Sequence, residues 1–263
     1  MRTYFIISFL LFSFLQMNAQ YTLDSKDENQ GKKGVIFYNE TAFNANIHTN
    51  GIALGVSWGK LKTYYLTKYF KLELGKLKHQ REKRQNSNRG NQPNGKVARP
   101  FVFGKKNSFY TVRALVGRKK YFSEKQIKKG VAVGVSYEGG FSLGLLKPYY
   151  LEVFFTQNDN QKLPVSIKYS EENRDRFLDQ LLIFGASKWT KGFSEISLIP
   201  GVNAKVAAHF DWGAYDEYVK ALEVGLMIDA FYKKVPIMVE TENLSNQFIF
   251  LNVFVNLQLG ARR

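Results

Sequence analysis

The side chains best suited to acid–base or metal chemistry are few in this sequence. It contains three histidines, His48, His79 and His209, and no cysteine. Asp211 follows His209 on the same face of an expected strand, about 7 Å away, but no sequence feature ties a nucleophilic serine to this pair. The histidines also lack the spacing of metal ligands. We therefore expect no enzymatic activity and no cofactor or metal site, and we retain a lipid-modifying enzyme as the alternative.

A second candidate site consists of charged residues that would share the inner face of the strands considered below. Both signs occur together, so opposite charges would pair, because an unpaired charge in a narrow interior is very costly. The same residues could instead line a narrow path for ions or solutes, and both interpretations stay open. The residues of this predicted lumen charge network are Glu40, Lys71, Glu73, Arg113, Glu138, Glu152, Lys205, Glu223 and Asp229.

The third candidate is a polar, basic segment between residues 78 and 100 that is rich in Asn and Gln. It could contact lipopolysaccharide or another polyanion, or it could be a surface loop whose charges are solvated. The formal net charge of the chain is +16, which favours anionic partners, but no nucleic-acid motif accompanies it. The expected partners are outer-membrane lipids, lipopolysaccharide or an envelope protein, and not nucleic acid. The basic residues predicted to make this contact are Lys78, Arg81, Lys83, Arg84 and Arg89.

Strict alternation of bulky and small residues predicts the elements that would position these side chains. In residues 51–59 and 131–138, bulky apolar side chains alternate with mostly Gly, Ala and Ser. A soluble antiparallel sheet usually turns long charged side chains to water on its second face. Small side chains instead suit the crowded inside of a narrow barrel whose bulky residues face lipid.

Similar segments recur along the chain and predict an all-β fold. Single-chain bacterial barrels have even numbers of strands, so we expect a closed antiparallel transmembrane β-barrel of about ten strands, with eight or twelve as alternatives. For residues 173–184 a short helix competes with the strand interpretation. The expected strands lie near residues 35–47, 51–59, 63–76, 108–117, 131–138, 151–155, 181–188, 196–211, 222–230 and 249–259.

The first nineteen residues have the composition of a signal peptide. Arg2 precedes an apolar run from Tyr4 to Leu15, which as a helix would reach only about 18 Å, short of the ~30 Å hydrocarbon core. Such a run suits the apolar region of an export signal that is cleaved after Ala19. Residues 20–263 would then form a single barrel domain.

The sequence also carries a resemblance to known proteins. Its start, which ends Met17-Asn-Ala-Gln20, resembles signal peptides common in Bacteroidota. Stretches such as Ser142-Leu-Gly-Leu-Leu-Lys-Pro-Tyr-Tyr-Leu-Glu152 and Ala221-Leu-Glu-Val-Gly-Leu-Met-Ile-Asp229 resemble uncharacterised outer-membrane β-barrel families of that phylum. The resemblance is one of pattern and brings no catalytic residue. It implies a location in the outer membrane of a Gram-negative bacterium after signal-peptide cleavage.

Together these patterns predict an integral outer-membrane barrel of structural or interaction type, such as an accessory subunit of an envelope assembly. Its basic loops would contact lipid phosphates or a partner. Two alternatives remain open: a narrow channel or transporter for small solutes, and a soluble periplasmic barrel that binds a lipid inside. In the soluble alternative the apolar faces of the strands would point inwards.

Overall fold

A computed structural model describes residues 37–86, 97–123, 130–156, 162–213, 217–241 and 244–263. The predicted signal peptide (residues 1–19) and Arg89 of the predicted basic loop lie outside these ranges. No helix among the described residues is both long enough and apolar enough to cross a membrane.

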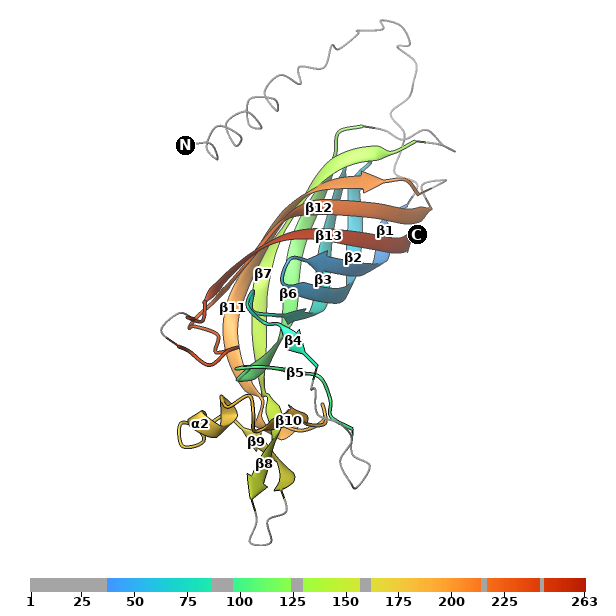
Figure 1. Cartoon of the computed structure of the whole chain (residues 1–263). Coiled ribbons are helices and arrows are strands. Elements are labelled where there is room, and N and C mark those ends of the chain that lie inside the picture. The colour runs from blue at the N-terminus through green and yellow to red at the C-terminus, as the bar shows by residue number, and fades with distance from the viewer. Residues whose placement is uncertain (1–36, 87–96, 124–129, 157–161, 214–216, 242–243) are drawn as a thin grey trace, which may run out of the picture. The chain divides into compact units, whose positions relative to one another are not determined.

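Eight antiparallel strands close into a barrel (Figure 1). Each strand pairs with the barrel strands before and after it in the chain, and the ring closes where the first strand pairs with the last, from Glu40 opposite Arg262 to His48 opposite Phe254. A closed sheet leaves no edge, so each strand finds backbone partners on both sides. The barrel strands are β1 (Asn39–His48), β2 (Gly51–Thr63), β3 (Leu66–Leu77), β6 (Asn107–Tyr121), β7 (Ala132–Pro148), β11 (Ser197–Asp211), β12 (Tyr218–Phe231) and β13 (Ile249–Arg262).

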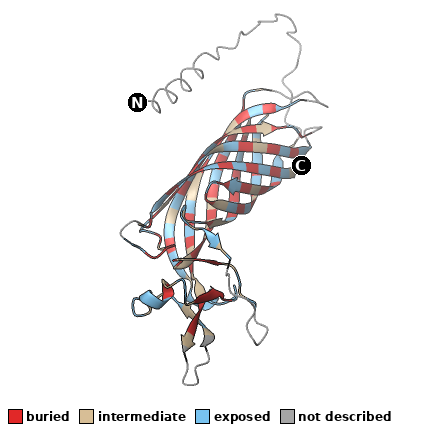
Figure 2. Cartoon of the chain, in the orientation of Figure 1, coloured by how far each residue is buried: buried red, intermediate tan, exposed pale blue. Residues whose placement is uncertain are grey.

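The sequence alternation predicts the two faces of the barrel wall correctly. Buried and exposed residues alternate along the barrel strands, as the red and pale blue bands in Figure 2 show. On β13, for example, Phe250 and Phe254 are buried, whereas Leu251 and Val253 are exposed. Bulky apolar side chains therefore cover the outside of the barrel, and the predicted inner face is the buried one.

The expected number of about ten barrel strands is corrected to eight. All ten predicted segments contain strands, but residues 151–155 and 181–188 contribute to a separate three-stranded sheet. This sheet has the order β10-β8-β9 and consists of β8 (Tyr150–Thr156), β9 (Lys162–Lys168) and β10 (Ile183–Ala186).

The burial of β8 explains why it is not part of the barrel wall. Residues 151–154 of β8 are all buried, so β8 is covered on both faces and does not separate a lipid side from a lumen side. Of the short helix that was the alternative for residues 173–184, only α2 (Arg174–Phe177) forms among the described residues, and β10 follows it. The remaining elements are a 3-10 helix, η1 (Phe193–Glu195), and a two-stranded sheet of β4 (Arg84–Gln85) and β5 (Phe101–Val102).

The two ends of the barrel differ in the length of their connections. At one end, here called the short-turn end, residues 64–65, 122–131 and 212–217 join the strands, and β1 begins and β13 ends there. At the other end, called the long-loop end, one connection is a two-residue turn at Thr49 and Asn50. The other three connections at that end comprise residues 78–106, 149–196 and 232–248.

Candidate functional site

The centre of the barrel lumen holds a connected group of charged side chains. Arg113 on β6 donates to both carboxylate oxygens of Asp229 on β12, at 2.9 Å from Nε and 2.9 Å from Nη2. Its Nη1 donates to Glu73 on β3 at 2.6 Å. Lys205 on β11 reaches the other oxygen of Glu73 at 2.7 Å and also contacts Glu138 on β7 at 3.2 Å. These contacts join five strands across the interior.

Two further groups complete the pairing around Glu138. The ammonium group of Lys71 lies 2.7 Å from its carboxylate, and the hydroxyl of Tyr69 donates to the same oxygen at 2.8 Å. Lys71 and Tyr69 are neighbours on the inner face of β3, two residues apart, as strand geometry requires. Glu138 therefore has both ammonium and hydroxyl contacts, and its charge is compensated within the lumen.

A second charged group lies toward the short-turn end and crosses the seam between the first and last strands. Glu40 on β1 accepts from Lys119 at 2.7 Å and from Arg262 on β13 at 3.0 Å. Arg262 also donates to Asp211 at 2.8 Å, and Lys119 donates to the side-chain oxygen of Gln258 at 2.7 Å. The seam is therefore held by the Glu40–Arg262 ion pair as well as by backbone hydrogen bonds.

His209 does not form the pair with Asp211 that was considered from sequence. Its Nδ1 lies 3.0 Å from a carboxylate oxygen of Glu223, and its Nε2 lies 3.1 Å from the hydroxyl of Tyr121. Asn256 donates to the other oxygen of Glu223 at 2.7 Å. His209 is fully buried, and the described residues contain no group of three or more His, Cys, Asp or Glu side chains that could hold a metal ion.

The structure places eight of the nine residues of the predicted network inside the barrel, and Glu152 is the exception. Glu152 lies on β8 in the separate sheet, so its assignment to the lumen is wrong. The prediction also missed Lys119 and Arg262, although both continue an alternation that was recognised in their strands. The eight residues that lie on the buried inner face are Glu40, Lys71, Glu73, Arg113, Glu138, Lys205, Glu223 and Asp229.

The charges of the described lumen are closely balanced. Its inward-facing residues include six carboxylates and five lysine or arginine side chains, together with His209. Each carboxylate contacts at least one of these basic groups. The six are Glu40, Glu73, Glu138, Asp211, Glu223 and Asp229. Such mutual pairing favours a filled interior over an open path lined by free charges.

The long-loop end of the lumen is closed by a cluster of apolar side chains, here called the apolar stopper. Phe109 lies at its centre, with its ring centroid 5.0 Å from that of Phe231 and 6.1 Å from that of Phe250. The backbone amides of Lys106 and Asn107 both donate to the carbonyl of Ile237, which holds the β12–β13 connection in place. The stopper consists of Leu77, Phe109, Leu146, Ile199, Phe231, Val235, Ile237, Met238 and Phe250.

The predicted basic loop leaves β3 at the long-loop end. Its described cations, Lys78, Arg81, Lys83 and Arg84, are exposed. Glu82, between them, forms an ion pair with the buried Lys105. The loop is therefore anchored at Glu82 and presents its positive charges to the surroundings.

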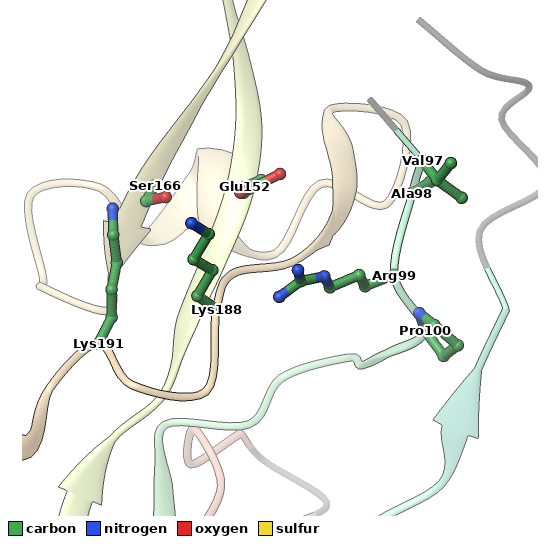
Figure 3. Close-up of a pocket in the computed structure, with 8 residues that line it drawn as sticks. All are labelled: Val97, Ala98, Arg99, Pro100, Glu152, Ser166, Lys188 and Lys191. Carbon is green, nitrogen blue, oxygen red and sulfur yellow. The ribbon is translucent and has the colours of Figure 1, made fainter. Parts of the chain in front are cut away.

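Glu152 borders a surface hollow of about 700 Å³ instead of the lumen. In Figure 3, Arg99 and Lys188, which belong to different connections, extend into the same space, and Lys191 points toward Ser166. The basic surface at this end thus includes cations from outside the predicted loop. The hollow is lined by Val97, Ala98, Arg99, Pro100, Glu152, Ser166, Lys188 and Lys191.

Comparisons with known proteins were made for the whole chain. No protein-family model matches it, and no curated protein matches it. Among solved structures, the crystal structure of Neisserial surface protein A matches with a TM-score of 0.40 and 8% sequence identity. The match covers 86% of this chain and 95% of that one.

Proposed function

We propose that this protein is an integral outer-membrane β-barrel of structural or interaction type, that it is not an enzyme, and that its lumen does not conduct solutes. The observation that carries the proposal is a closed eight-stranded barrel with apolar side chains outside and paired charges inside. A closed barrel is the way in which strands can satisfy every backbone group within a bilayer.

The outer surface supports membrane insertion. Large apolar side chains are exposed on every barrel strand, for example Leu74 at 65% and Phe141 at 77% of their full exposure. Soluble monomers rarely expose contiguous apolar patches larger than a few hundred Å². A soluble barrel that binds lipid inside would need the opposite arrangement, with charges outside and apolar side chains within. The observed faces therefore favour the membrane protein over that alternative.

The connections support an orientation in the membrane. Outer-membrane barrels have short periplasmic turns and longer extracellular loops. The short-turn end of this barrel would accordingly face the periplasm, and the long-loop end would face outwards. In this orientation the basic loop and the β8–β10 sheet lie where they could contact lipid phosphates or a protein partner, as an accessory subunit of an envelope assembly would.

The first test is fractionation of cells that express the full chain, followed by electrophoresis of samples with and without boiling. We expect the protein to sediment with the outer membrane and to migrate differently when it is not boiled, because a closed barrel resists dodecyl sulfate until it is heated. Release by osmotic shock, or identical migration of both samples, would contradict the proposal.

The second expected result is electrical silence in planar bilayers. Ion pairs fill the lumen and the apolar stopper closes its long-loop end, so heat-modifiable wild-type protein should give no reproducible current steps under voltage. Glu223→Gln and Lys205→Ala are the informative variants, since both residues face the lumen. Wild-type steps whose size either variant changes would instead establish the narrow channel.

A further inference from the structure

Cationic side chains converge on one hollow at the long-loop end, outside the barrel wall. The hollow has a volume of about 450 Å³, within the range of ligand-binding pockets. Glu82 is the one carboxylate among the described residues that line it. We call this hollow the basic basin. Its eight cations are Lys76, Lys78, Arg84, Arg99, Lys105, Lys147, Lys188 and Lys191.

The basin is assembled from parts of the chain that are distant in sequence. Lys76 lies near the end of β3 and Lys147 near the end of β7. Arg84 and Arg99 come from the β3–β6 connection, and Lys188 comes from the β7–β11 connection. Like charges gathered from two connections repel one another. Their convergence is therefore consistent with a binding site for an anion.

Two lysines in the floor of the basin are almost fully buried. Lys105 is 4% exposed and pairs with Glu82. Burial lowers the pKa of Lys105, its ion pair with Glu82 opposes that change, and the neighbouring Lys76 and Lys78 lower it further. The basin therefore already holds more positive charge than its single carboxylate compensates.

Lys147 has no carboxylate partner among the described residues. It is 3% exposed, and its ammonium group donates to the main-chain carbonyls of Trp189 and Lys191, the latter at 3.0 Å. The ammonium nitrogen also lies 4.7 Å from the ring centroid of Phe193. These contacts solvate the cation without neutralising it, so an anion in the basin would gain from the uncompensated charge.

A buried hydroxyl in the same wall lacks a partner. Ser187 is 8% exposed and lines the basin, yet its Oγ makes no hydrogen bond with any described residue. A buried polar group without a partner costs about 1–3 kcal/mol. A ligand oxygen that accepts from this hydroxyl would remove that cost.

The barrel wall next to the basin is apolar. On its outer face, Leu74, Val112 and Leu143 lie side by side on β3, β6 and β7. Lys76 lies two residues beyond Leu74, toward the long-loop end, and is level with Tyr110. A cationic hollow directly above a lipid-facing wall fits an amphipathic ligand, with its anionic group in the hollow and its chains along the wall.

We propose that the basic basin binds the phosphorylated headgroup of an outer-leaflet lipid, with the acyl chains against the outer face of β3, β6 and β7. The inference rests on the proposed membrane location and specifies the ligand that the long-loop end contacts. Phosphate suits the site because its several oxygens can accept from lysine, arginine and hydroxyl donors at once.

The test uses the full chain folded in detergent, with heat-modifiable migration as the check of folding. Native mass spectrometry would measure the binding of diphosphoryl lipid A, of the same lipid with its phosphates removed, and of inorganic phosphate. We expect at least tenfold tighter binding of the phosphorylated lipid than of either other probe. Equal binding of both lipids would overturn the proposal, and equal binding of inorganic phosphate would assign the basin to a soluble anion.

Matched variants locate the binding. Lys78, Lys188 and Lys191 are exposed in the basin, so replacing all three with glutamine should weaken lipid A binding at least tenfold. The control removes the same charge from the outer face near the short-turn end, through glutamine at the exposed Lys60, Lys68 and Lys220. It should change binding less than twofold, and equal losses in both variants would show non-specific attraction.

A single-residue variant tests the unpartnered hydroxyl. Ser187→Ala should reduce lipid A affinity severalfold while leaving the apparent melting temperature of the lipid-free protein unchanged or slightly raised. Unchanged affinity would exclude Ser187 from the site. If the wild type migrates identically in electrophoresis with and without boiling, the proposed barrel function is refuted instead. A heat-modifiable wild type that does not distinguish the two lipids refutes the basin proposal alone.

Discussion

Replacing Arg113 with methionine is expected to lower the free energy of unfolding by about 3–5 kcal/mol, or to prevent barrel formation. Arg113 is fully buried and pairs with both Glu73 and Asp229. Methionine would leave Asp229 without a cationic contact and Glu73 with Lys205 alone. Urea unfolding of the protein in vesicles, followed by heat-modifiable migration, measures the change.

Arg118 supplies the control for this substitution. It lies on the same strand as Arg113 but on the outer face, where it is exposed. Arg118→Met should therefore change stability by about 0.5 kcal/mol or less. A triple variant, Arg113→Met with Glu73→Gln and Asp229→Asn, should be less destabilised than Arg113→Met alone, because it removes the orphaned charges. Equal stability of Arg113→Met and Arg118→Met would contradict the structural role of the ion pairs.

Phe109→Ala should also destabilise the barrel strongly, by about 3–5 kcal/mol. The ring of Phe109 is fully buried in the apolar stopper and contacts two other phenylalanine rings. Its removal would leave a cavity at the long-loop end of the lumen. The same unfolding assay would measure the loss.

Val116→Ala on the same strand is the matched control for Phe109→Ala. Val116 is 66% exposed on the outer face, so its truncation should cost less than about 1 kcal/mol. Phe109→Ala should remain electrically silent, because the charged network lies on the other side of the stopper and still fills the lumen. Equal losses in the two variants would show that Phe109 has no special part in the packing.

The sequence predicted the faces of the strands well because side-chain alternation is a local property. It placed Glu73, Arg113 and Asp229 correctly on the inner face without any knowledge of their partners. It did not identify which strands pair, because pairing depends on distant segments. For that reason β8 was counted in the barrel and Glu152 was assigned to its lumen.

The basic basin, in contrast, could be predicted only in part from the sequence. The predicted basic segment, residues 78–100, contains three of its cations, Lys78, Arg84 and Arg99. The others include Lys147 on β7, and Lys188 and Lys191 in the β7–β11 connection, which the fold brings to the same hollow. A run of basic residues is visible in sequence, but a hollow formed by several connections requires the folded chain.

The ion pair at the seam between β1 and β13 has a consequence for how the proposed membrane barrel would enter a bilayer. Glu40 and Arg262 are 222 residues apart in the chain and meet when the first and last strands pair. In any partly assembled sheet these two side chains would be separated, and placing either ion in hydrocarbon without this partner would be costly. Insertion and ring closure should therefore occur as one concerted event, with the final strand already synthesised before the first is committed to lipid.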